Sequence, residues 1–148
     1  MFRGSCETRM DEKRRLKIPA PFRRVIDERF PGGEFFITST TGNHARIYPM
    51  AIWKGIEQIL SGFPGENESK KRFLNHINYY GLEQQMDAQG RLVIHAPLRT
   101  KAELQGDVMV IAQGNYLEVW PRDRFVIDQI ENNPYTDSDS KVLETFGI

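Results

Sequence analysis

The feature that most constrains this sequence is an internal duplication. Residues 10–23 and residues 86–99 match at an offset of 76 positions, and eight of their fourteen residues are identical. Chance agreement of this extent in so short a window is rare, so we infer two copies of one folding unit. A half of about 70 residues builds too small a core to be stable alone. We therefore expect the two copies to pack against each other or against further chains.

The sequence patterns of the two copies predict the same elements in the same order: a strand, a tight turn, a strand, a short helix, a β-hairpin and another helix. In the second copy, Asp87 and Gly90 occupy the first and last positions of a type I turn. Leu92 and Ile94 then recur with the period of two that is typical of a strand, and Pro97 falls in the first turn of a helix. The expected hairpin strands are residues 34–38, 45–48, 107–112 and 116–120, and the expected linking helix covers residues 68–80.

Composition favours a soluble, globular protein of the cytoplasm. The longest apolar run, Val108–Ala112, is far shorter than the roughly 20 residues of a membrane-spanning helix. The N-terminus lacks the apolar segment of a signal peptide, and the single cysteine, Cys6, cannot form an internal disulfide. The net charge is zero, but residues 1–24 carry +5 and residues 122–148 carry −3. The basic end of the chain therefore comes first.

These patterns divide the chain into four parts. They are a first half-domain (residues 1–60), a linking helical segment (residues 61–80), a second half-domain (residues 81–132) and an acidic C-terminal tail (residues 133–148).

Three motifs together closely resemble the MraZ family. They are the opening Met1–Gly4, the doubled D-x-x-x-R motif (Asp11 to Arg15 and Asp87 to Arg91), and the doubled R-L-x-I-x-A-P-x-R. The resemblance spans almost the whole chain. It implies an α+β fold of two pseudo-symmetric, AbrB-like swapped-hairpin halves, similar to a double-split β-barrel, with short helices.

The same resemblance implies a function. It suggests a transcriptional regulator, a repressor of the cell-division and cell-wall gene cluster, that associates with the nucleoid. It also suggests that the protein assembles into a ring-shaped homo-oligomer and binds short direct repeats in double-stranded DNA.

The resemblance places DNA contacts on the two D-x-x-x-R turns. Arginine offers a planar fork of donors that fits a phosphate or the edge of guanine. A carboxylate repels phosphate, so we expect each aspartate to bind its own turn amides and to orient its arginine. The candidate DNA-binding residues are Arg3, Arg9, Asp11, Lys13, Arg14, Arg15, Lys17, Asp87 and Arg91. Because the first turn holds three consecutive cations, we expect it to supply most of the affinity and to aim Arg15 outward.

Three further positions carry expectations. The family usually has glycine in both turns, but the first copy has Arg14 where the second has Gly90. Either Arg14 bears the strain of a left-handed conformation, about 1–2 kcal/mol, or the first turn has another shape. Arg23 and Arg99 recur in the repeat, and they are equally consistent with local salt bridges and with a function. We expect Phe2, with Met1, to anchor in a neighbouring subunit.

No motif supports catalysis or a cofactor. The histidines and Cys6 lack metal-ligand spacing, and no nucleophile, phosphate-loop or dinucleotide motif is present. We therefore expect no enzyme activity, no metal, no cofactor and no small-molecule substrate. Two alternatives to a regulator stay open. One is an antitoxin-like swapped-hairpin module, and the other is a structural or interaction ring without a DNA role, which the neutral overall charge favours.

Overall fold

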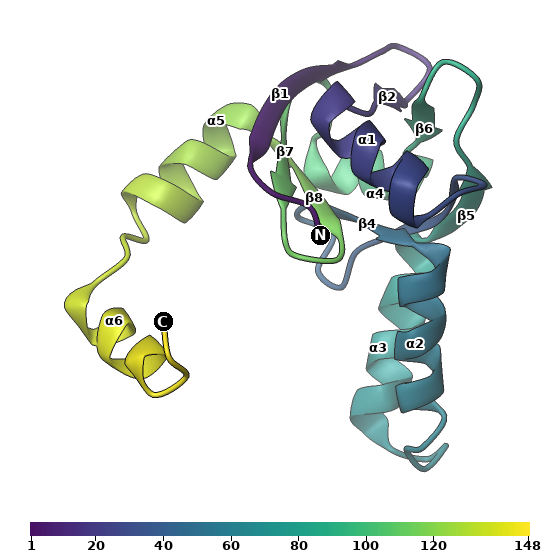
Figure 1. Ribbon diagram of the computed structural model, residues 1–148. Coiled ribbons are helices and arrows are strands. Elements are labelled where there is room, and N and C mark those ends of the chain that lie inside the picture. The colour runs from purple at the N-terminus through teal and green to yellow at the C-terminus, as the bar shows by residue number, and fades with distance from the viewer.

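The computed structural model describes residues 1–148 and confirms the α+β class. Eight antiparallel strands form one sheet that curls into a nearly closed barrel, with helices around it (Figure 1). The strands are β1 (Ser5–Met10), β2 (Arg15–Lys17), β3 (Glu34–Thr38), β4 (Ala45–Pro49), β5 (Leu82–Gln85), β6 (Arg91–Val93), β7 (Gly106–Ala112) and β8 (Leu117–Pro121). The helices are α1 (Ala20–Arg29), α2 (Met50–Leu60), α3 (Glu68–Tyr80), α4 (Ala96–Ala102), α5 (Arg122–Arg124), the π-helical η1 (Phe125–Glu131) and α6 (Asp137–Glu144).

The two copies exchange strands. The order in the sheet is β5-β3-β4-β8-β7-β1-β2-β6, so β1 of the first copy pairs with β7 of the second, and β5 of the second pairs with β3 of the first. β2 pairs with its counterpart β6, and β4 pairs with its counterpart β8. This exchange is the swapped-hairpin arrangement that the resemblance implied, and it explains how two small halves share one core.

A side chain closes the barrel where the two ends of the sheet meet. The Gln84 Oε1 atom accepts a hydrogen bond from the Val93 amide at 2.5 Å, and its Nε2 donates to the Val93 carbonyl. The equivalent position in the first copy is Thr8, whose hydroxyl donates to the Lys17 carbonyl at 3.4 Å. Gln84 thus replaces the backbone ladder that β5 and β6 lack.

The core lies inside the barrel and draws on both copies. Leu16 and Leu92 lie opposite each other on β2 and β6, and both are fully buried. Phe2 is also buried, with its ring 6.1 Å from that of Phe22 and 6.2 Å from that of Phe30. The expectation that Phe2 anchors in a neighbouring subunit is therefore wrong, because it fills a space beneath its own helix α1.

Two helical parts project from the barrel. Helices α2 and α3 form a hairpin that extends from one side, and η1 and α6 form an arm that extends from another (Figure 1). Helix α6 lies within the segment that the sequence described only as an acidic tail, and Thr136 and Asp139 form a capping box at its start. No helix combines the length and the hydrophobicity needed to cross a lipid bilayer.

Candidate nucleic-acid interface

The two D-x-x-x-R turns have the same internal geometry. Asp11 Oδ1 accepts hydrogen bonds from the amides of Lys13 and Arg15 at 2.9 and 2.8 Å, and its Oδ2 accepts one from Arg15 Nε at 2.6 Å. In the second turn, Asp87 Oδ1 accepts from the amides of residues 89 and 91, both at 2.9 Å, and Oδ2 accepts from Arg91 Nε at 2.7 Å. The expected intramolecular role of both aspartates is confirmed.

These contacts keep both carboxylates charged. Partial burial acts to raise the pKa of Asp11, but hydrogen bonds from the Arg15 amide and side chain and from the Lys13 amide bring it below its ordinary value. For Asp87, the hydrogen bond from the Arg91 amide is the main cause of a lowered pKa. At neutral pH each aspartate is therefore an anion that partly neutralises the arginine of its own turn.

The first turn keeps the glycine-type shape without a glycine. Arg14 has φ = 64° and Gly90 has φ = 76°, so both lie in the left-handed region. Of the two alternatives for Arg14, the strained conformation is the one observed. Its carbonyl accepts a hydrogen bond from the Ile94 amide at 2.9 Å, and the Gly90 carbonyl accepts one from the Ile18 amide at 2.9 Å. Each turn is thereby tied to the opposite copy.

Pairing of β2 with β6 brings cations of both copies onto one surface. Lys17 lies opposite Arg91, and Arg15 lies opposite Val93. Alternate residues of a strand point to opposite faces, and the intervening leucines are buried in the core. Arg15, Lys17 and Arg91 therefore share the outer face of a two-stranded ribbon, and the two turns lie next to each other at the upper right of Figure 1.

The two lysines are the most exposed cations of this surface, and Arg14 is half-buried without a salt bridge. Lys13 and Lys17 are exposed and form no salt bridge. The side chains of Arg15 and Arg91 are only 29% and 28% exposed, because each Nε is engaged by its aspartate. Arg15 is thus held through its Nε against its own turn, on the outer face of the ribbon, and its two terminal nitrogens make no hydrogen bond within the chain.

Two candidate residues lie outside the turns and the β2–β6 ribbon. Arg9 is on β1, and its Nη1 lies 3.3 Å from the Asp107 carboxylate of β7 in an exposed ion pair. Arg3 precedes the far end of β1, where the neighbouring Phe2 amide donates to the Gly114 carbonyl between β7 and β8 at 2.9 Å. The structure brings Lys13, Arg14, Arg15, Lys17 and Arg91 together, but it does not bring Arg3 to them.

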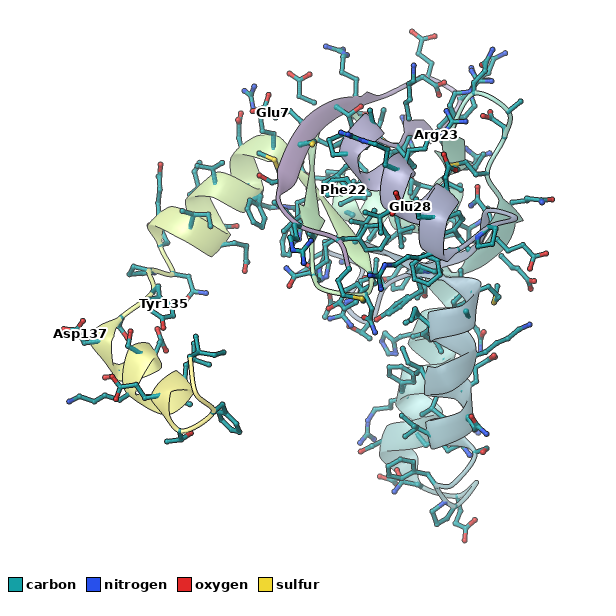
Figure 2. The ribbon with its side chains drawn as sticks, in the orientation of Figure 1. Glu7, Phe22, Arg23, Glu28, Tyr135 and Asp137 are labelled. Carbon is teal, nitrogen blue, oxygen red and sulfur yellow. The ribbon has the colours of Figure 1, made fainter.

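A further arginine belongs to this surface. Arg23 of α1 lies at the upper end of the barrel (Figure 2), and its Nη2 lies 3.5 Å from the Ala88 carbonyl in the second turn. A Cβ atom at Gly90 would come within 2.5 Å of Arg23 Nη1. The second turn is thus covered by an arginine of the opposite copy. In the sequence, the only sign of a role for Arg23 was that the second copy has an arginine, Arg99, at the same position. That repetition did not decide between a local salt bridge and a function.

A second polar cluster lies between β4 and β8. Glu118 is buried, accepts a hydrogen bond from Trp120 Nε1 at 2.9 Å and lies 3.4 Å from His44 Nε2. Burial acts to raise the pKa of Glu118, whereas hydrogen bonding to His44 and Trp120 brings it below its ordinary value. The His44 ring also stacks on Trp120 at 4.3 Å. This cluster therefore connects the first copy to the second. It is not a metal site, because no group of three or more potential metal ligands occurs in the chain.

Comparison with known proteins gives one consistent result. Residues 1–76 and 82–144 match the family described as "MraZ protein, putative antitoxin-like". The chain is 47% identical to the "Transcriptional regulator MraZ" of Acidobacterium capsulatum and 42% identical to that of Koribacter versatilis, in each case over the full length of both proteins. It is 35% identical to the protein of the same name from Nitrosomonas europaea, again over both full lengths.

Proposed function

The chain belongs to the MraZ family, and we propose that it is a sequence-specific, DNA-binding transcriptional regulator. We propose further that it is a ring-shaped homo-oligomer that binds short direct repeats and represses the cell-division and cell-wall gene cluster at the nucleoid. The observation that carries the proposal is the ribbon of β2 and β6, which presents cations from both copies beside two rigid turns. The names of the relatives support the regulatory role.

The geometry suggests a division of labour among the cations. Lys13 and Lys17 are free to contact phosphates, and each neutralised phosphate contributes about 0.9 to the salt dependence of binding. Arg15 and Arg91 are held by Asp11 and Asp87, so their terminal nitrogens face DNA with little orientational freedom left to lose. Such a fixed fork suits a guanine edge or a phosphate. In this proposal the aspartates position the arginines and do not touch DNA.

A homo-oligomer would bind most tightly to DNA that carries several copies of its binding site. A few phosphate contacts bind weakly, but several linked copies gain avidity when their sites can be occupied together. Repeats spaced by about one helical turn, ~10 base pairs, would present the same side of the duplex to successive copies.

The direct test is a titration of labelled duplexes across a range of salt concentrations. The duplexes carry tandem repeats from the region upstream of the cell-wall gene cluster, a single repeat, or a scrambled sequence. We expect the affinity to be highest for the tandem repeats, lower for the single repeat and lowest for the scrambled sequence. We expect Lys13→Ala and Lys17→Ala each to weaken binding and to reduce the salt slope by about 0.9 for each copy that contacts the duplex. Lys54→Ala, on the projecting helix α2, is the matched control and should bind like the wild type.

The outcomes separate the alternatives. Equal affinity for one repeat and for the tandem array would contradict the avidity argument, and binding without salt dependence would contradict the role of the lysines. A protein that forms a ring but binds none of the duplexes would be the structural or interaction ring that the neutral net charge favours. The antitoxin-like alternative rests on the family description, and it requires a second protein bound together with the operator.

A further inference from the structure

The C-terminal arm, residues 125–148, exposes an unusual amount of apolar surface. Six of the ten exposed large hydrophobic residues of the chain lie in it, with exposed fractions from 47% to 82%: Ile127, Ile130, Tyr135, Val142, Phe146 and Ile148. No residue of η1 or α6 is buried. The arm stands clear of the barrel, as the side chains of Tyr135 and Asp137 show (Figure 2). Clusters of exposed apolar residues mark surfaces that bind something.

The arm ends in an amphipathic helix. The Thr136 hydroxyl accepts from the Asp139 amide, and the Asp139 carboxylate accepts from the Thr136 amide at 2.8 Å, so the start of α6 is fixed. Val142 lies in the last turn of α6, and Phe146 lies in the turn that follows the helix, where its amide donates to the Leu143 carbonyl at 2.9 Å. A helix of this kind typically binds by laying its apolar face into a hydrophobic groove.

A groove of that kind lies along α2, on the other projection of the molecule. We name it the α2 groove; its lining includes Arg46, Tyr48, Ile52, Ile56, Ile59 and Tyr116. The three isoleucines are spaced by four and three residues and so form one helix face. The rings of Tyr48 and Tyr116 stack at 4.8 Å and form the opposite wall. Ile59 is 70% exposed, so this face lacks an apolar partner within the chain.

The charges of the arm and the groove are complementary. The arm carries five acidic residues and one lysine, a net charge of −4. The only charged residue that lines the groove is Arg46, whose guanidinium lies 5.7 Å from the centre of the Tyr116 ring. Its Nε has no hydrogen-bond partner but lies 3.8 Å from the Glu118 carboxylate in an ion pair, and its Nη1 donates to the Tyr48 hydroxyl at 3.3 Å.

We propose that the arm of one copy binds in the α2 groove of the next copy. The arm and the groove are different surfaces, so the contact is head-to-tail and can repeat from copy to copy until a ring closes. This inference rests on the proposed homo-oligomer and names the contact that builds it. It is independent of whether the assembled protein binds DNA.

The first test measures the mass of the full chain in solution by light scattering. The arm variant Val142→Asp/Phe146→Asp and the groove variant Ile59→Lys should both reduce the mass from that of the oligomer to that of a monomer. Tyr79→Lys changes an equally exposed aromatic residue outside the groove, and it should keep the oligomer. The arm residues are exposed, so their replacement leaves the barrel folded, which circular dichroism checks. An arm variant with the wild-type mass overturns the inference, as does a wild-type protein that is monomeric.

The second test identifies the partner of the arm by disulfide formation in a Cys6→Ser background. A chain with Ile59→Cys is mixed with a chain carrying Phe146→Cys, and the expected product is a covalent dimer that contains both. The inference is overturned if the mixture gives no such dimer while a chain with both cysteines closes on itself. If the cross-link forms and the wild-type ring binds none of the DNA duplexes, the proposed function fails and the arm contact stands.

Discussion

Asp11 and Asp87 hold their turns together only as carboxylates, so the stability of each turn depends on pH. The pKa of Asp87 lies below its ordinary value of 3.8 in the folded protein. A carboxyl group whose pKa is lower in the folded than in the unfolded protein stabilises the fold when it is charged. This stabilisation is fully present above the unfolded pKa of 3.8, and it is lost as the pH falls through the lower pKa of the folded protein. We expect Asp87→Asn to have a lower melting temperature than the wild type at pH 7, because an amide cannot pair with Arg91 in the same way.

Thermal melts from pH 7 down to pH 2 check this expectation. The difference in melting temperature between Asp87→Asn and the wild type should shrink below pH 3.8 and disappear as the wild-type carboxylate is protonated. A difference that stays constant over the whole range would show that charge on Asp87 does not stabilise the turn.

The left-handed residues of the two turns predict opposite effects of substitution. Arg14 has φ = 64°, which costs about 1–2 kcal/mol for a residue with a side chain, while a glycine adds about 0.5–1 kcal/mol of chain entropy cost. Arg14→Gly should therefore raise the free energy of unfolding by about 0.5–1 kcal/mol. Gly90→Ala should lower it by a similar amount, because alanine bears the left-handed strain, while the Arg23 guanidinium that its Cβ would meet ends a flexible side chain and can move aside. Urea unfolding measures both, and a destabilised Arg14→Gly variant would show that the Arg14 side chain makes a contact worth more than the strain.

Among the elements, the junction between β5 and β6 depends on a single side chain. Gln84→Ala would leave both the amide and the carbonyl of Val93 without their partner, and an unmade hydrogen bond at a partly buried group costs about 1–3 kcal/mol. Thr8→Ala is the matched control at the equivalent position of the first copy. Its effect should be smaller, because that hydroxyl lies 3.4 Å from its acceptor. Hydrogen exchange of the Val93 amide reports the opening, and unchanged protection in Gln84→Ala would contradict this role.

The elements also show how far the sequence can predict the structure. The span of β3 and the helix at residues 68–80 follow from local signals, such as periodicity and the Asn67 cap of α3. The exchange of β1 and β5 does not follow from them, because alternation tells which face of a strand is buried and not which strand is its neighbour. That exchange came from the family resemblance alone.

The candidate site, too, was predictable from the sequence only in part. The D-x-x-x-R spacing was enough to predict that Asp11 would bind its own turn and orient Arg15. It could not show that this contact holds Arg15 against the turn, or that Lys13 and Lys17 are exposed without an ion pair. The contact between Arg23 and the turn at Gly90 could not be predicted from the sequence either, because the two residues are 67 positions apart.

Because the copies exchange strands, neither half of the molecule has a sheet of its own. β2 pairs with β6, β4 with β8, and each first strand with the hairpin of the other copy. One cluster of buried residues includes Leu16 and Leu92 from the two copies. Unfolding one half would therefore expose the core and the unpaired edges of the other. We expect the barrel and the base of the α2–α3 hairpin to unfold in one cooperative transition.

The chain provides its own reporters for this expectation, since Trp53 lies on α2 and Trp120 on β8. Trp53 packs on Tyr48 of β4 at 5.1 Å, and the Thr38 hydroxyl of β3 donates to the Ile77 carbonyl of α3 at 2.6 Å, so the hairpin is tied to the sheet. In Trp53→Phe and in Trp120→Phe, the fluorescence of the remaining tryptophan should give the same urea midpoint as far-ultraviolet circular dichroism. Both are measured at one protein concentration, because the midpoint of any protein that assembles depends on concentration. Separate midpoints within either variant would mean that the halves, or the hairpin, unfold independently in spite of the exchanged strands.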